Sequence, residues 1–316
     1  MIALRPLDNN LHHLEDEPTT RRYAMKMTRR TLLNAGGAFL AATASRTTIA
    51  ASRPVRFGVR SPLPDVGLRE RALLVKRLGF DGIELGDDWS AKPLEFLQKE
   101  LDGTGVAVSA VVGSIGLLNT DPDKRAQAIE TDRRRLELAQ ALNAECLIEV
   151  PTFGPNRFQD LSPIMNPREI EERLLISALK ELAADVEKSG VILLLEPCNH
   201  KETHFMCRQS QAAKIIESVG SPGYGILSDF YHMQIEEPSI AETLSRFGRY
   251  TRYVHLADGE KRLEPGSLPF DYRPGFGELK KVGYRGWLTI ESEFTDNPEA
   301  ALGRALPYLK QQWAEA

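Results

Sequence analysis

The chain of 316 residues has little of what organises several other classes of protein. Its three cysteines cannot supply a disulfide framework, and at least one thiol stays unpaired in any compartment. No apolar run reaches the roughly 18 residues that a membrane-spanning helix needs. The formal net charge of −4 offers no basic surface to a nucleic acid. We therefore expect a packed hydrophobic core and no nucleic-acid partner.

A glycine motif that cradles phosphates is also missing. No G-x-G-x-x-G follows the first apolar run, and the glycines at 113–116 and 275–277 lack a strand-turn-helix context. A dinucleotide-binding fold therefore has little support.

Residues 1–50 differ from the rest of the chain in charge. They hold seven of the 40 basic residues but only four of the 44 acidic ones. Arg29 and Arg30 precede a short apolar stretch with glycines, and Thr48-Ile49-Ala50 offers the small residues that a signal peptidase reads. This layout resembles a bacterial twin-arginine export signal, which implies a periplasmic or secreted protein with no membrane anchor after cleavage. The alternative is an amphipathic helix packed on the body. Translation could start at three methionines: Met1, Met25 and Met27.

In residues 51–316, short apolar or β-branched runs alternate with segments of helical period, eight of each, at about 33 residues per unit. Continuous apolar runs such as 191–195 are typical of a parallel sheet covered on both faces. A (β/α)8 TIM barrel and a doubly wound sheet both suit this alternation, and the length favours the barrel, as a single domain. The expected strands are 55–60, 82–85, 107–112, 146–150, 191–197, 225–230, 253–257 and 288–291. The expected helices lie near 66–79, 93–102, 122–143, 167–189, 209–219, 238–247, 276–282 and 298–313.

The last four expected strands each end in a side chain that can bind a metal. These side chains are Glu196, Asp229, His255 and Glu291. Their spacings of 33, 26 and 36 residues are close to one unit, which places them side by side at the C-terminal rim, where barrel active sites lie.

A single carboxylate at a strand end is usually a cap or a surface group, but three carboxylates and an imidazole together need a counter-charge. The donor set favours one divalent cation, Mn²⁺ first, with Mg²⁺, Co²⁺ and Zn²⁺ as alternatives. Glu149, at the end of the fourth strand, is a candidate substrate contact.

Four segments resemble the xylose-isomerase-like superfamily of TIM-barrel sugar isomerases and epimerases, in the style of ketose 3-epimerases and hydroxypyruvate isomerases. The resemblance covers about residues 55–313, and its specific part is 191–293. The segments are Glu196-Pro197-Cys198-Asn199-His200-Lys201-Glu202, Asp229-Phe230-Tyr231-His232-Met233, His255-Leu256-Ala257-Asp258 and Gly286-Trp287-Leu288-Thr289-Ile290-Glu291.

This resemblance implies that Glu196, Asp229, His255 and Glu291 bind one divalent metal, and that Glu196 and Glu291 act as the acid/base pair. It implies substrate-binding or supporting positions at four further residues: Asn199, Glu202, His232 and Arg262. His200 stands where many of the epimerases have arginine, and Asp258 where some have glutamate.

The function implied is a metal-dependent isomerase or epimerase that moves an α-carbon proton of an unphosphorylated ketose or keto-sugar through an enediolate. A lyase or dehydratase acting on a related keto-sugar or cyclic polyol begins with the same proton abstraction and stays open. A sugar-binding barrel without catalysis and a homo-oligomer also stay open. A DNA-repair endonuclease is disfavoured because it needs more histidines and a basic surface.

Overall fold

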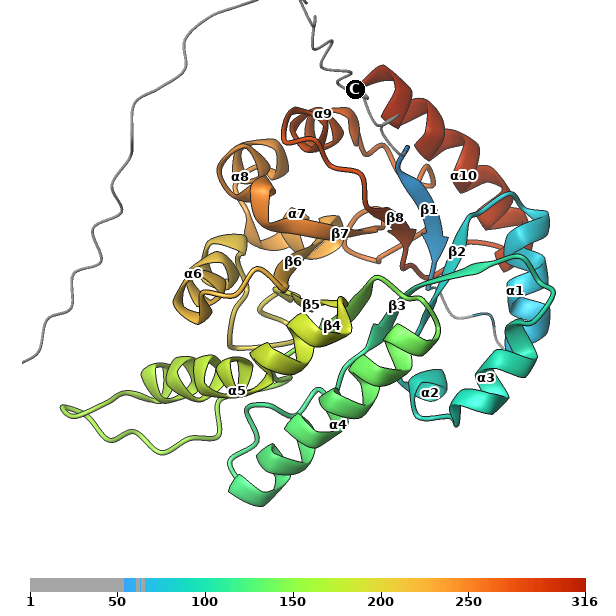
Figure 1. Ribbon diagram of the computed structural model, residues 1–316. Helices are drawn as coiled ribbons and strands as arrows, with labels where there is room; N and C mark the ends of the chain where they lie inside the picture. Colours follow the sequence, from blue (N-terminus) through green and yellow to red (C-terminus); the bar gives the residue numbers. More distant parts are fainter. Residues whose placement is uncertain (1–53, 61–62, 64–65) are drawn as a thin grey trace, which may run out of the picture. The chain divides into compact units, whose positions relative to one another are not determined.

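The computed structural model describes residues 54–60, 63 and 66–316, so the expected export signal and its cleavage site lie outside the described residues. Eight parallel strands form one closed barrel in chain order, and β1 pairs with β8 to complete it. Figure 1 shows the helices arranged around the central strands. The closed sheet confirms the TIM barrel and excludes the doubly wound alternative, whose sheet would have two edges.

The eight expected strands are all present, and each begins and ends within two residues of its expected bounds. The strands are β1 (Arg56–Val59), β2 (Gly82–Leu85), β3 (Ala107–Val112), β4 (Cys146–Glu149), β5 (Ile192–Leu195), β6 (Tyr224–Asp229), β7 (Thr251–Leu256) and β8 (Trp287–Ile290).

The helices that follow the strands also lie close to their expected positions, and two short ones, α2 and α7, were not expected. The helices are α1 (Leu68–Arg77), α2 (Asp87–Ser90), α3 (Leu94–Leu101), α4 (Pro122–Ala141), α5 (Pro167–Ser189), α6 (Gln209–Val219), α7 (Phe230–Glu236), α8 (Ile240–Phe247), α9 (Arg273–Lys281) and α10 (Pro298–Glu315), with a 3₁₀ turn, η1, at Gly248–Tyr250. Among the described residues, no helix combines the length and apolar character that crossing a bilayer requires.

Local sequence fixes where the longest helices begin and end. The Asp121 side chain caps the start of α4, and the Asn166 and Glu169 side chains form a reciprocal capping box at the start of α5. A proline stands at the first position of both helices, where its missing N–H costs nothing. Gly190 ends α5 in the left-handed conformation, at φ 70°.

The direction of each side chain at the barrel mouth follows from the side chains that fill the barrel interior. One buried cluster holds the inward-facing residues Ala110, Cys146, Ile148, Leu194, Leu227, Tyr253 and Trp287. Because side chains alternate along a strand, the residue two places after an inward-facing one points to the same side. Glu196, Asp229 and His255 therefore point into the mouth, two places after Leu194, Leu227 and Tyr253. Glu291 does so four places after Trp287.

Candidate metal centre at the barrel mouth

The four side chains expected to bind a metal converge, as the sequence predicts. Each of Glu196, Asp229, His255 and Glu291 offers one ligand atom, and these atoms all lie within 4.8 Å of one another. Three of the four residues are buried and Glu291 is half-buried. We call these four residues the ligand cluster. They come from the ends of four consecutive strands, so barrel geometry brings them together.

The two carboxylate oxygens of Asp229 make different contacts, one with helix α7 and one within the ligand cluster. Its Oδ1 accepts a hydrogen bond of 2.8 Å from the Tyr231 backbone N–H and so caps α7. Its Oδ2 faces the cluster. The unexpected helix α7 thus begins directly after a residue of the ligand cluster, and the cap fixes the orientation of the Asp229 carboxylate.

Arg262 reaches the ligand cluster from the loop after β7, where the resemblance implies a substrate-binding arginine. Its Nη2 lies 2.6 Å from Asp229 Oδ2 and 2.6 Å from Glu291 Oε2. The guanidinium carbon lies 4.7 Å from the centroid of the Tyr231 ring, so the charge also stacks on an aromatic face. The Arg262 backbone has φ 54°, a left-handed conformation unusual for arginine.

Asp258 holds this loop in place. Its carboxylate accepts hydrogen bonds from the Gly266 and Leu268 backbone N–H groups and from the Tyr272 hydroxyl, at 2.8, 3.1 and 2.5 Å. Asp258 is fully buried and its contacts are structural. It therefore supports the loop that carries Arg262.

Arg60 and Glu84, from the first two units, were not predicted, yet both contact residues of the ligand cluster. Arg60 forms an ion pair with Glu291, and its Nε lies 3.2 Å from Glu84 Oε1. Glu84 Oε2 lies 2.8 Å from His255 Nε2. Gly58 and Gly82 face the barrel interior, because a Cβ atom on either would meet the inward-facing Trp287 side chain. Arg60 and Glu84 stand two places after these glycines and therefore point to the same side. A charged residue inside the apolar run 82–85 was the available signal.

The charges around the cluster lower the pKa values of its glutamates and raise the pKa of its histidine. Burial would raise the pKa of Glu291, but Arg60, Arg262 and His255 hold it well below its usual range. Burial alone would likewise raise the pKa of Glu196, and its contacts with His255 lower it. Burial would lower the pKa of His255, whereas Glu84 and Glu291 raise it well above its ordinary value. Among these protein groups, both glutamates are therefore ionised and able to accept a proton.

Asn199, Glu202 and His232 form a connected group beside the cluster, where the resemblance implies substrate contacts. The Asn199 side-chain amide lies 2.8 Å from Glu202 Oε1 and 2.8 Å from His232 Nδ1. The Asn199 backbone N–H also donates to His232 Nδ1, at 3.2 Å. Since Nδ1 accepts, the ring proton lies on Nε2, which is 3.4 Å from Asp229 Oδ2. His232 thus presents an N–H toward the mouth.

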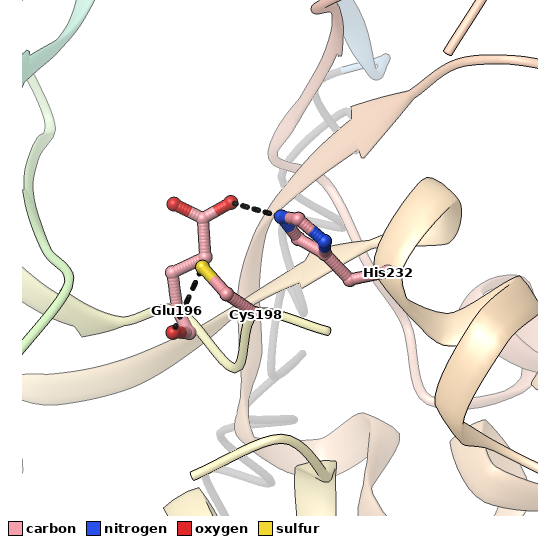
Figure 2. A group of neighbouring side chains, drawn as sticks. All are labelled: Glu196, Cys198 and His232. Carbon is pink, nitrogen blue, oxygen red and sulfur yellow. Dashed lines mark hydrogen bonds and ion pairs between the residues drawn. The ribbon is translucent and has the colours of Figure 1, made fainter. Parts of the chain in front are cut away.

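A second group of side chains also lies close enough together to hold a metal ion: Glu196, Cys198 and His232. Figure 2 shows the His232 ring facing the Glu196 carboxylate, while the Cys198 thiol approaches the Glu196 backbone carbonyl. Burial raises the pKa of the Cys198 thiol well above its ordinary value, so the thiolate that a metal binds is disfavoured. His232 Nε2 carries the ring proton. The ligand cluster is therefore the better metal site.

Glu149 does not reach the ligand cluster, which corrects the expectation that it contacts substrate. It follows the inward-facing Ile148 by one place, so its side chain points outward, toward α4. There it is fully buried beside Asp132 and the glycine at position 113.

The residues of the ligand cluster fit a divalent cation. His255 Nδ1 is buried and makes no well-aligned hydrogen bond, although it lies 2.7 Å from Glu291 Oε2 and 3.5 Å from Glu196 Oε1. Three carboxylates and one imidazole match the oxygen-rich donor sets of Mn²⁺ and Mg²⁺. The Arg262 guanidinium bridges two of these carboxylates, as a cation between them would.

Known proteins of similar sequence include sugar epimerases. The chain is 26% identical over 246 residues to 3-dehydro-D-guloside 4-epimerase of Escherichia coli (strain K12), an alignment that covers 76% of this chain and 93% of that protein. It is 26% identical over 257 residues to L-ribulose 3-epimerase of Methylomonas sp. (strain DH-1), which covers 79% and 87%.

Among solved structures, an apo 3-keto-D-glucoside 4-epimerase from E. coli superposes with a TM-score of 0.72 at 23% identity, covering 81% of this chain and 99% of that one. This likeness shows a shared fold. The family model described as xylose isomerase-like TIM barrel matches residues 72–312. The chain therefore belongs to the xylose isomerase-like TIM barrel family, and its relatives include sugar epimerases and a putative hydroxypyruvate isomerase of Streptomyces coelicolor.

Proposed function

We propose that this protein is a divalent-metal-dependent sugar epimerase or isomerase that moves an α-carbon proton of an unphosphorylated ketose or keto-sugar through an enediolate. The observation that carries the proposal is the convergence of Glu196 and Glu291 with His255 and Asp229 at one mouth. The lowered pKa values of both glutamates, caused by neighbouring cationic groups, support it. Relatives named as sugar epimerases support the reaction class.

Glu196 and Glu291 are the proposed acid/base pair. One carboxylate removes the α-proton and the other returns a proton, and each step contributes roughly 10²–10⁴-fold to the rate. Return to the opposite face of the same carbon gives epimerisation, and return to the neighbouring carbon gives isomerisation. Arg262 and the His232 Nε2–H are the proposed donors to substrate oxygens. Support comes from their contacts, since both face the mouth and both are held by their neighbours.

Glu196, Asp229, His255 and Glu291 would hold the cation. A divalent cation there would supply Lewis-acid polarisation of the substrate carbonyl, which can contribute several kcal/mol. Manganese is the proposed identity because it accepts mixed carboxylate and imidazole ligands.

The central experiment follows exchange of the substrate α-proton with solvent. Purified protein loaded with Mn²⁺ is incubated in heavy water with a panel of ketoses and keto-glycosides, and deuterium incorporation is measured by mass spectrometry. Exchange with an epimer or isomer as product is expected, and chelation should abolish it until Mn²⁺ is restored. The variants E196Q and E291Q should lose exchange while keeping the fold.

Other outcomes separate the competing functions. Full exchange in both E196Q and E291Q would contradict the proposed acid/base pair. An eliminated, dehydrated product would indicate the lyase or dehydratase. Tight sugar binding without exchange on any substrate would indicate a binding barrel.

We also propose that the protein is exported through residues 1–50. The support is the pair Arg29 and Arg30 before a short apolar stretch. Replacing both arginines by lysine keeps the charge and should retain the protein in the cytoplasm of a bacterial host, measured by cell fractionation. Unchanged periplasmic delivery of this variant would contradict twin-arginine export. N-terminal sequencing of the exported protein should place the cleavage near Ala50.

A further inference from the structure

The two nitrogens of His255 lie in different surroundings. Nε2 is 2.8 Å from Glu84 Oε2, whereas Nδ1 faces Glu291 Oε2 at 2.7 Å and Glu196 Oε1 at 3.5 Å. The side chains of His255 and Glu84 are both fully buried. One nitrogen thus faces the ligand cluster and the other faces a carboxylate outside it.

This arrangement selects one tautomer of a neutral His255. With the proton on Nε2, the ring donates a hydrogen bond to Glu84 and directs the Nδ1 lone pair at the cluster. With the proton on Nδ1, the Nε2 lone pair would face a Glu84 oxygen at 2.8 Å in a buried site, which is repulsive. Metal-binding histidines usually donate their second ring N–H to such a carboxylate.

Arg60 holds Glu84 in this position. The barrel register pairs Val59 with Ile83. The residues that follow them, Arg60 directly after β1 and Glu84 in β2, therefore lie side by side at the mouth. The Arg60 Nε lies 3.2 Å from Glu84 Oε1, and the same guanidinium also pairs with Glu291. A buried carboxylate without a counter-charge would be costly, and Arg60 offsets that cost.

We propose that Glu84 is a positioning residue of the metal centre, which fixes the tautomer and ring orientation of His255 so that Nδ1 faces the cation. Arg60 in turn fixes Glu84. Neither residue is required to touch the reacting carbon. The inference rests on the proposed function, since it gives His255 a cation to bind.

Metal affinity tests the inference independently of turnover. Mn²⁺ is titrated calorimetrically into the chelator-treated full chain and into E84A and E84Q. Removing the outer partner of a metal-binding histidine typically weakens metal binding by about 10–100-fold, and we expect this loss in E84A. E84Q should lose less affinity, because its amide oxygen still accepts a hydrogen bond. Circular dichroism and thermal melting establish that each variant is folded.

A spectroscopic readout follows the hydrogen bond itself. In protein loaded with diamagnetic Zn²⁺, the His255 Nε2–H proton should give a downfield NMR signal that exchanges slowly with water. E84A should abolish this signal. The matched control is E171Q, because the buried Glu171 pairs in the same way with the half-buried His204, at 2.6 Å and outside the ligand cluster. E171Q should leave the Mn²⁺ affinity and the His255 signal unchanged.

The outcomes separate this inference from the proposed function. Unchanged Mn²⁺ affinity and an unchanged His255 signal in folded E84A would overturn the role of Glu84, and so would a proton on His255 Nδ1 in the Zn²⁺-loaded, unsubstituted protein. If E84A does not fold, full affinity and an unshifted signal in E84Q would overturn it. Absence of metal binding by the unsubstituted chain would overturn both proposals. Metal binding with these Glu84 effects but without proton exchange on any sugar would contradict the proposed function alone.

Discussion

Asp132 on α4 and Glu149 on β4 bring two carboxyl groups together in the space between strand and helix, where neither side chain is exposed. Asp132 accepts hydrogen bonds from the Ser114 backbone N–H and hydroxyl, at 2.7 and 3.1 Å. Neither Glu149 oxygen makes a well-formed hydrogen bond. Burial raises the pKa of Asp132 to about 6, and burial together with Asp132 raises that of Glu149 well above its usual value.

The free energy of unfolding should therefore fall as the pH rises toward the raised pKa values of these two carboxyl groups. The folded state holds protons that the unfolded state releases at about pH 4, so the stabilising contribution is complete below about pH 4. It is lost as the pH rises from there through the folded pKa values, about 6 for Asp132 and well above the ordinary value for Glu149. D132N and E149Q should each raise the free energy of unfolding at pH 7.5 by about 1–3 kcal/mol. Urea denaturation at pH 5 and pH 7.5 measures this, with the exposed E95Q as control. A pH dependence as steep in D132N as in the unsubstituted chain would contradict the interpretation.

Gly113 should be essential for packing next to this pair. A Cβ atom there would collide with Glu149 Oε2 and lie 2.8 Å from the Ile148 carbonyl oxygen. G113A should destabilise the protein by about 1–3 kcal/mol, because the backbone cannot move away. In G277A, a Cβ in α9 meets nothing within 4 Å, and the gain in helix propensity should stabilise by about 0.5–1 kcal/mol. Thermal melts of the two variants should therefore shift in opposite directions.

Removing Arg262 should separate metal binding from substrate binding. Its Nη2 bridges Asp229 and Glu291 oxygens that a cation would also need. R262M should bind Mn²⁺ at least as tightly as the unsubstituted protein, because it removes a competing positive charge. Its kcat/KM should fall about 10–100-fold, as expected when charged hydrogen bonds to a substrate are lost.

Calorimetry and the deuterium-exchange rate check the two expectations for Arg262. The control is R77M, which removes an exposed arginine paired with Glu299. Weakened metal binding in R262M would mean that Arg262 supports the ligand cluster instead of competing for it.

Cys198 should make no contribution to metal binding. Although Figure 2 places its thiol near Glu196 and His232, the raised pKa keeps the sulfur protonated. C198S should retain the Mn²⁺ and Zn²⁺ affinities of the unsubstituted protein, measured by competition with a chromophoric chelator. Zn²⁺ is the more sensitive probe because it favours thiolate ligands. A loss of Zn²⁺ affinity in C198S but not in the half-buried control C207S would show that the thiol is a ligand.

The alternation of apolar runs and helical segments was sufficient to predict the barrel and the convergence of the four side chains of the ligand cluster, because each of them lies within one residue of the end of its own strand. The same rule misplaced Glu149, since the end of a strand does not by itself show which way a side chain points. Glu149 stands one place after the inward-facing Ile148, and Glu196 stands two places after Leu194. Helix α7 was missed because seven residues are too few to show a helical period.

Arg60 and Glu84 were missed for a different reason. Neither belongs to a motif that the resemblance supplied, and their importance depends on contacts with residues 171 to 231 positions later in the chain. Only the closed barrel brings those partners together.

The pairing of β1 with β8 has a consequence for any attempt to divide this protein. All four residues of the ligand cluster lie on the half that begins at β5, whereas Arg60 and Glu84 lie on the half that ends at β4. A fragment starting after β4 would carry every ligand and still leave His255 without its hydrogen-bond acceptor and Glu291 without one of its arginines. Mixing the two fragments should therefore restore tight Mn²⁺ binding only when they reassemble. The Mn²⁺ affinity of the mixture would then measure whether β8 has paired with β1 again.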